Sequence, residues 1–116
     1  MATVEITADN IDQITADNEI VAIDFWAAWC GPCRMFSPIF EDASERHTDI
    51  VFGKVDTDAH PQLAQDFDVR SIPTLVVLRD NIVVHYSAGV TTPQQLDAIL
   101  DEVRNLDMEE VARQAN

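Results

Sequence analysis

Residues 19–43 read EIVAIDFWAAWCGPCRMFSPIFEDA and contain three consecutive signals. Residues 19–26 are rich in β-branched and aromatic side chains and almost free of charge, which is typical of a central strand buried on both faces. Two cysteines, Cys30 and Cys33, follow. After them apolar residues recur at three- and four-residue spacing, which predicts a helix; these residues are Met35, Phe36, Ile39, Phe40 and Ala43. The stretch therefore predicts a buried strand that leads through a cysteine pair into a helix.

The remaining chain is predicted to alternate strands and helices. Strands are expected at residues 4–6, 49–56, 73–78 and 82–86, and further helices near residues 11–14, 61–67 and 94–106. Thr7 or Asp9 is expected to cap the first helix, and Pro38 to kink the helix after the cysteines. The last two strands are joined at Asp80-Asn81, which predicts a hairpin, since Asn tolerates positive φ. The order β-α-β-α-β-α-β-β-α predicts an α/β fold with a mixed, partly parallel sheet and helices on both faces.

The length and composition fit a single compact domain. The chain has 116 residues, of which 47% are hydrophobic. The domain is expected to span residues 1–106, with residues 107–116 as a helical extension or tail that continues or frays the last helix. A domain of this size buries a core without cross-links, so the two cysteines are not needed as a structural staple.

The charge balance is strongly acidic, with 7 Lys and Arg against 21 Asp and Glu and a formal net charge of −14. Because nucleic acids and anionic membranes attract basic surfaces, neither is expected as a partner. The acidity is interpreted as a solvated surface that keeps the protein soluble, and adaptation to high salt is the alternative left open. No spare apolar helix face is evident, which favours a monomer.

The sequence predicts neither a membrane span nor an export signal. No apolar run approaches the length needed to cross a bilayer. Residues 1–20 lack a basic start and an apolar stretch, and they carry acidic residues that include Glu5, Asp9, Asp12 and Asp17. A cytoplasmic location is therefore expected, and in that reducing compartment a cysteine pair is more often catalytic or metal-binding than structural.

Two cysteines three residues apart are compatible with half of a zinc site, a structural disulfide or a redox pair. A tetrahedral zinc site needs about four ligands, usually Cys or His. The sequence offers no second cysteine pair, and His47, His60 and His85 fall on three separate predicted elements. No metal site is therefore expected, and each histidine is interpreted as a surface residue.

The position of the pair favours redox chemistry. Pro32 falls near the first helical turn, where its missing N–H costs nothing. Cys30 is therefore expected at the helix N-terminus, where free N–H groups and the helix dipole favour the thiolate. The thiolate is the nucleophile, so Cys30 is predicted to attack. Cys33, one turn inward and more buried, is predicted to resolve the mixed disulfide.

The sequence resembles the thioredoxin family. Trp29-Cys30-Gly31-Pro32-Cys33 matches the family's active-site motif in full, and the match continues through residues 24–27 before it and 34–38 after it. Further matches occur in the family's order at Lys54-Val55-Asp56, Ile72-Pro73-Thr74 and Gly89. The resemblance covers about residues 4–106. It implies the thioredoxin fold, a central mixed five-stranded β-sheet flanked by four α-helices.

The resemblance implies roles for two charged residues near the cysteines. Asp24 would be the buried carboxylate below the active site. Its place in an apolar strand predicts a raised pKa, which suits a proton acceptor for Cys33, acting through a water molecule. Lys54 would modulate the charge of that carboxylate. The alternatives are a strand-end Asp facing solvent and an ordinary exposed strand lysine.

The resemblance also implies a client-binding surface. Pro73 would be the family's cis-proline, packed against the disulfide and leaving the Ile72 backbone free to pair with a client strand. Proline at the start of a strand is the alternative, since most X–Pro bonds are trans. The flat apolar patch around Cys30 would comprise Trp29, Ile72, Pro73, Gly89 and Val90. Phe25 and Trp26 are expected in the core.

The predicted function is that of a protein-disulfide reductase that needs no bound cofactor, because the cysteine pair holds both electrons. The resemblance implies re-reduction by NADPH through thioredoxin reductase, and clients such as ribonucleotide reductase, peroxiredoxin and methionine sulfoxide reductase. An oxidase or isomerase on the same fold is one alternative. Gly31-Pro32 disfavours it, since such enzymes usually have histidine between the cysteines. A binding subunit or chaperone is the other alternative.

Overall fold

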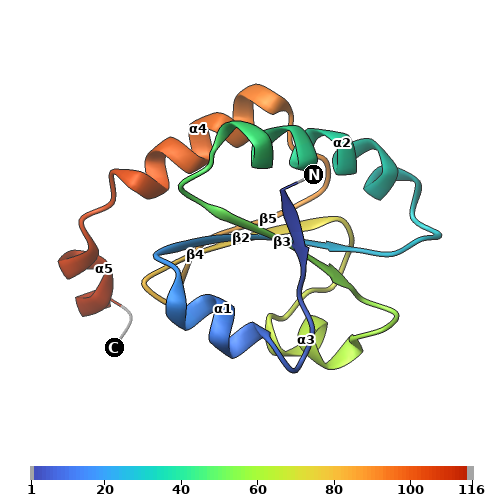
Figure 1. Cartoon of the computed structure of the whole chain (residues 1–116), viewed down its shortest axis with the longest axis horizontal. Helices are drawn as coiled ribbons and strands as arrows, with labels where there is room; N and C mark the ends of the chain where they lie inside the picture. The colour runs from blue at the N-terminus through green and yellow to red at the C-terminus, as the bar shows by residue number, and fades with distance from the viewer. Residues whose placement is uncertain (1, 115–116) are drawn as a thin grey trace.

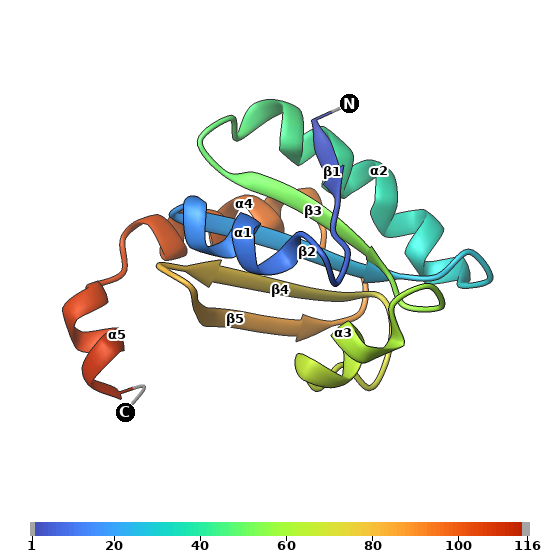
Figure 2. The same cartoon turned by 60° about the horizontal axis from the view of Figure 1, so that its bottom comes forward.

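Five strands form one sheet in the order β1-β3-β2-β4-β5 (Figures 1 and 2). The structure is a computed structural model that describes residues 2–114. The strands are β1 (Thr3–Glu5), β2 (Ile20–Trp26), β3 (Val51–Asp56), β4 (Thr74–Arg79) and β5 (Ile82–Ala88). Strands β1 and β2 run parallel to β3, whereas β4 is antiparallel to both β2 and β5. The predicted mixed sheet is therefore confirmed.

The helices lie on both faces of the sheet. They are α1 (Ile11–Asp17), α2 (Gly31–Arg46), α3 (Pro61–Asp66), α4 (Pro93–Arg104) and α5 (Met108–Gln114). Helices α2 and α4 cover one face, and α1 and α3 cover the other (Figure 1). The four flanking helices agree with the prediction, and α5 is a fifth helix beyond them.

Strand β2 is the centre of the core. Ala22 packs beneath α2 and α4, while Ile23 and Phe25 pack beneath α1 and α3. Because both faces are covered, β2 has no solvent side, which explains why its sequence is apolar except at Asp24. Asp24 is two residues from Ala22, so its side chain lies on the α2 face. The sheet therefore places this carboxyl directly below α2.

Two details on the helices differ from the predictions. The N-cap of α1 is Asn10, not Thr7 or Asp9, and the Asn10 Oδ1 accepts a hydrogen bond from the Thr7 N–H at 2.8 Å. Met35 is 65% exposed although it was assigned to the apolar stripe of α2. The stripe is formed by Phe36, Phe40 and Ala43, and Met35 lies one helical position, about 100°, to its side.

The connection between β4 and β5 is the expected hairpin. Asp80 and Asn81 both adopt positive φ, at 52° and 65°. Two consecutive residues of positive φ make a tight turn whose twist matches that of the flanking strands. The prediction for Asn81 is confirmed, and Asp80 shares the same conformation.

The chain after α4 does not continue that helix. The Arg79 guanidinium of β4 donates from Nη1 to the carbonyl oxygens of Val103, Arg104 and Leu106 at 2.8, 3.1 and 3.1 Å. These bonds satisfy carbonyls that a helix end leaves without partners. Helix α5 then begins separately, projects from the domain (Figure 2) and buries none of its side chains. Within residues 2–114, no helix is long and apolar enough to cross a bilayer.

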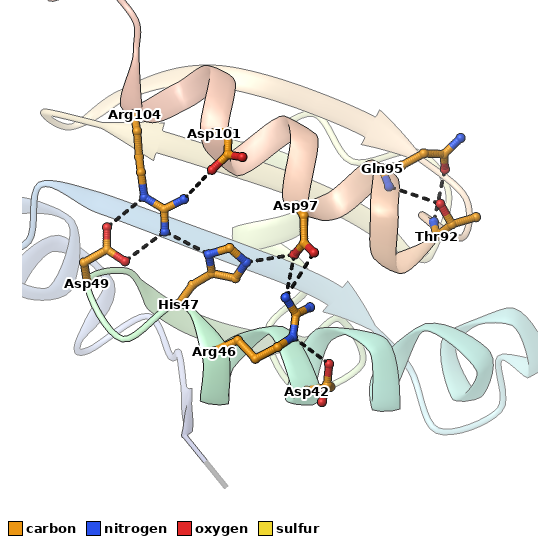
Figure 3. Close-up of polar contacts among 9 residues, drawn as sticks. All are labelled: Asp42, Arg46, His47, Asp49, Thr92, Gln95, Asp97, Asp101 and Arg104. Carbon is orange, nitrogen blue, oxygen red and sulfur yellow. Dashed lines mark hydrogen bonds and ion pairs between the residues drawn. The ribbon is translucent and has the colours of Figure 1, made fainter.

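A polar network fastens the C-terminal end of α2 to α4 (Figure 3). Asp97 accepts hydrogen bonds from Arg46 at 3.0 Å and lies 2.8 Å from His47 Nε2. On its other side, His47 Nδ1 lies 2.8 Å from an Arg104 nitrogen, and Arg104 also pairs with Asp49 at 2.8 Å. The His47 side chain is only 12% exposed, so its assignment to the surface was wrong. Its partners are about fifty residues away, and only the packing of α2 against α4 brings them together.

Candidate active site

The cysteine pair lies where β2 passes into α2. Cys30 is the N-cap residue, with extended backbone angles, and the Cys33 N–H donates to the Cys30 Sγ at 3.2 Å. Pro32 occupies the first turn, as expected. The two cysteines form a disulfide with their Cα atoms 5.3 Å apart. The N-terminal N–H groups and the positive end of the helix dipole therefore face the sulfur of Cys30.

The two cysteines differ in surroundings more than in burial. Cys30 is 4% exposed and Cys33 is 3% exposed, so the predicted greater burial of Cys33 is present but slight. The Cys30 Sγ lies 3.7 Å from the carbonyl oxygen of Ile72, beside an exposed rim. Cys33 instead borders a cavity of about 200 Å³ that Ser37 and Lys54 also line. The cavity connects the inner cysteine to the polar groups beneath α2.

Asp24 is fully buried on the α2 face of β2, paired across the strands with Lys54, which lines this cavity. The Asp24 side chain is 0% exposed, and neither carboxyl oxygen has a hydrogen-bond partner within residues 2–114. Burial raises the pKa of Asp24 from 3.8 to about 7; Lys54 opposes this rise and Glu41 adds to it. The alternative of a solvent-facing strand-end Asp is excluded. A carboxyl with a pKa near neutrality can both accept and release a proton under physiological conditions.

Lys54 is the strand neighbour of Asp24, since the two residues are paired across β3 and β2. Its ammonium donates to the Ser37 Oγ at 2.8 Å and lies 3.8 Å from the Glu41 Oε1. It also lies 5.3 Å from the centre of the Trp26 ring, a cation–π distance. Lys54 is therefore a partly buried residue of this site and not an exposed strand lysine.

The residues assigned to the client surface gather around Cys30. Trp29 is 67% exposed and Val90 37% exposed, and the Ile72–Pro73 peptide bond is cis. The Gly89 N–H donates to the Pro73 carbonyl at 2.8 Å, and Gly89 has a φ of 92°, which favours glycine. Trp29 and Ile72 line a groove of about 320 Å³. These contacts join Trp29, Ile72, Pro73 and Gly89 beside Cys30, and Val90 follows Gly89 in the chain.

The two aromatic residues of β2 were assigned to the core. Phe25 is fully buried there. Trp26 is partly buried, packs against the cysteine cluster and lies under the Lys54 ammonium. It therefore belongs to the wall of the site as well as to the core.

Sequence reasoning missed three polar residues of the site. Asp58 accepts a hydrogen bond from the Trp29 indole at 3.0 Å, and this link between two loops has no sequence signal. Ser37 and Glu41 contact Lys54, and their four-residue spacing on one helix face was an available signal. Within residues 2–114, no group of three His, Cys, Asp or Glu side chains is placed to bind a metal ion.

A redox-capable cysteine pair at the start of a helix, above a buried carboxyl in a mixed sheet, defines a thiol–disulfide oxidoreductase. Comparison with known proteins gives the family: the Thioredoxin family model matches residues 2–102. The chain belongs to the thioredoxin family, and its function is that of a disulfide reductase with Cys30–Cys33 as the redox pair.

Individual relatives agree with this assignment. A Streptomyces coelicolor relative, a thioredoxin 2 by name, is 49% identical over 112 residues, covering 97% of this chain and 84% of its own. The thioredoxin of Alicyclobacillus acidocaldarius is 38% identical over 103 residues, covering 88% and 98%. Among solved structures, a mutant thioredoxin from Halobacterium salinarum has a TM-score of 0.82 and 34% identity, covering 90% of this chain and 91% of its own.

Proposed function

We propose that Cys30 is the attacking and Cys33 the resolving cysteine in the reduction of protein disulfides. The observation that carries this assignment is the position of Cys30 as the N-cap of α2, with the Cys33 N–H donating to its sulfur. N–H groups and the helix dipole stabilise a thiolate there, and the thiolate is the nucleophile. Cys33 lies inside the first turn and lacks this position.

The proposed reaction has two exchanges. The Cys30 thiolate attacks one sulfur of the client disulfide, forms a mixed disulfide and displaces the other client sulfur as a thiolate. Cys33 then loses its proton to Asp24 and attacks the Cys30 sulfur. The client sulfur leaves as a thiolate, and the Cys30–Cys33 disulfide forms. Two electrons pass from the cysteine pair to the client.

The proposed roles of Asp24 and Lys54 follow from their burial and position. Asp24 has a pKa of about 7 and lies under α2 next to Lys54, which lines the same cavity as Cys33, so we assign it the proton of Cys33. The cavity has room for a bridging water, to which Ser37 and Lys54 offer polar partners. Lys54 is its cationic neighbour and sets how readily the carboxyl ionises.

The proposed client surface is the rim formed by Trp29, Ile72, Pro73, Gly89 and Val90. Exposed aromatic and aliphatic side chains provide an apolar contact, and the neighbouring backbone at Ile72 is suited to pair with an extended segment. Gly31 and Pro32 complete the loop between the cysteines. This surface would bind protein segments without demanding one sequence.

The proposed cellular setting follows from the family. We propose that electrons come from NADPH through thioredoxin reductase, and that oxidised ribonucleotide reductase, peroxiredoxin or methionine sulfoxide reductase are clients. The cytoplasm is the proposed location, since a dithiol reductant stays reduced there. The proposed domain comprises residues 1–106, acting as a monomer.

The first test is the equilibrium reduction potential of Cys30–Cys33 in a dithiothreitol or glutathione buffer. A reductant of this kind is expected near about −270 mV. A value of about −180 mV or above would instead indicate an isomerase-like or oxidising protein. Replacing both cysteines by serine provides the second arm: a reductase loses its effect on clients, whereas a binding subunit retains it.

A further inference from the structure

The Lys54 ammonium is held by groups other than its strand neighbour Asp24. It donates to the Ser37 Oγ at 2.8 Å and lies 3.8 Å from the Glu41 Oε1. Neither oxygen of Asp24 has a hydrogen-bond partner within residues 2–114. The Lys54 ammonium therefore contacts side chains of α2, and the Asp24 carboxyl has no direct hydrogen-bond partner among the described residues.

Glu41 is itself fixed in place. The Thr3 hydroxyl of β1 donates to its Oε1 at 3.0 Å, the same oxygen that faces Lys54. The Glu41 side chain is only 19% exposed, and its Oε2 is buried without a hydrogen-bond partner in the described residues. Desolvating a carboxylate costs free energy. The partly buried position of Glu41 therefore depends on its contacts with Thr3 and Lys54.

The groups around Asp24 come from every element packed against it. Helix α2 contributes Glu41 and Cys33, β3 contributes Lys54, and the β4 residue paired with Asp24 is the apolar Leu75. Glu5 of β1 and Asp56 of β3 share an outer hollow with Lys54. Arg34 of α2 lines the same cavity as Lys54, and its guanidinium donates to the Ala28 carbonyl at 3.0 Å. Lys54 is the cation paired with Asp24 across the strands, and Glu41 is its carboxylate partner.

We propose that Glu41 is a positioning residue for disulfide exchange: with Ser37 it holds the Lys54 ammonium against α2, and so controls how readily Asp24 gains and releases a proton. The inference rests on the proposed role of Asp24 in the reaction. Two effects of Glu41 act in the same direction. Its negative charge disfavours a second carboxylate nearby, and its contact with Lys54 restrains the cation that would otherwise stabilise ionised Asp24.

The test is the titration midpoint of the Asp24 carboxyl, followed by carbon NMR in the full chain with Glu41→Gln. We expect the midpoint to fall by about half a pH unit or more, because a like charge is removed and Lys54 is released. The pH profile of insulin reduction should shift in the same direction. Asp42→Asn is the matched control, since Asp42 is an adjacent but exposed carboxylate of α2 paired with Arg46. In this variant the titration midpoint of Asp24 should equal that of the wild type.

Thr3→Val provides a second variant of similar shape. It removes the hydroxyl that donates to Glu41, so the titration midpoint of Asp24 should fall, but by less than in Glu41→Gln. An unchanged midpoint in Glu41→Gln, or an equal fall in Asp42→Asn, would overturn the inference. The proposed role of Asp24 is tested separately by the rate of Asp24→Asn. A normal rate there would remove that role, while a shifted midpoint in Glu41→Gln would still support the control of Asp24 by Glu41.

Discussion

At the N-terminal end of α2, the buried carboxyl of Asp24 has no hydrogen-bond partner among the described residues, and its cationic neighbour Lys54 is bound to α2 instead. At the C-terminal end of the same helix, Arg46 and His47 contact Asp97, and each charge there faces an opposite charge or a polar donor (Figure 3). The two ends have similar residue types. They differ in burial and in pairing.

This difference gives the carboxyls opposite pKa shifts. Burial raises the pKa of Asp24 to about 7. At the other end, the hydrogen bond from Arg104 lowers the pKa of Asp49, and that from His47 lowers the pKa of Asp97. An unpaired buried carboxyl favours its neutral form, whereas an exposed paired one favours its charged form. One end of α2 therefore has a group suited to proton transfer, and the other has charges that fasten helices together.

The largest expected effect is at the cysteines. Cys30→Ser should reduce the rate of insulin disulfide reduction at least about a thousandfold, because the nucleophile is lost. Cys33→Ser should be as slow, but it should accumulate a mixed disulfide that mass spectrometry detects. A mixed disulfide in Cys30→Ser and none in Cys33→Ser would reverse the proposed roles.

The second prediction concerns Asp24 and the pH dependence of stability. Its folded pKa of about 7 lies above the ordinary value of 3.8, so between these values the native state binds more protons than the unfolded state. The contribution of Asp24 to the free energy of unfolding is therefore fully present below about pH 4 and is lost as the pH rises through 7. The total loss is about 4 kcal/mol. Asp24→Asn should remove this loss, so urea unfolding should show a gain over wild type at pH 8 and little difference at pH 4. An equal gain at both pH values would contradict the burial argument.

The third prediction concerns the opposite end of α2. Arg104→Gln removes the pairing with Asp49 and Asp101 and the contact with His47. Asp49 and Asp97 have lowered pKa values in the folded protein. The stability that these two carboxylates contribute to the fold is therefore present above about pH 4 and is lost as the pH falls through their folded pKa values. We expect a loss of about 1 kcal/mol at pH 7 and low salt, shrinking at pH 3 and in 1 M salt. The reduction potential should stay unchanged; a shifted potential would mean that the two ends are coupled.

The smallest effect is expected for Asp42→Asn. Asp42 is 67% exposed and pairs with Arg46 across one helical turn. Pairs of this kind contribute little to stability, because water screens both charges. The midpoint of thermal unfolding should therefore change by no more than about two degrees. A larger loss would show that the network depends on Asp42 to orient Arg46 toward Asp97.

Local sequence signals predicted the elements well. The alternation of strands and helices, the central position of β2 and the hairpin at Asn81 followed from side-chain periodicity and turn chemistry, which act over a few residues. Predictions failed where an element is defined by distant contacts. Met35 fits the helical spacing but lies beside the buried stripe, and the end of α4 depends on Arg79 from β4.

The sequence by itself determined the redox pair and its place before a helix, because both rest on local order. It predicted the raised pKa of Asp24 from a charge within an apolar strand, and burial in the folded structure decided it. Only the tertiary structure decided the partners of the charges. It placed Lys54 against Ser37 and Glu41, and it placed His47 between Asp97 and Arg104. The physical reason is that electrostatic interactions depend on distance and burial in space, and helix packing sets these between residues that are far apart in the chain.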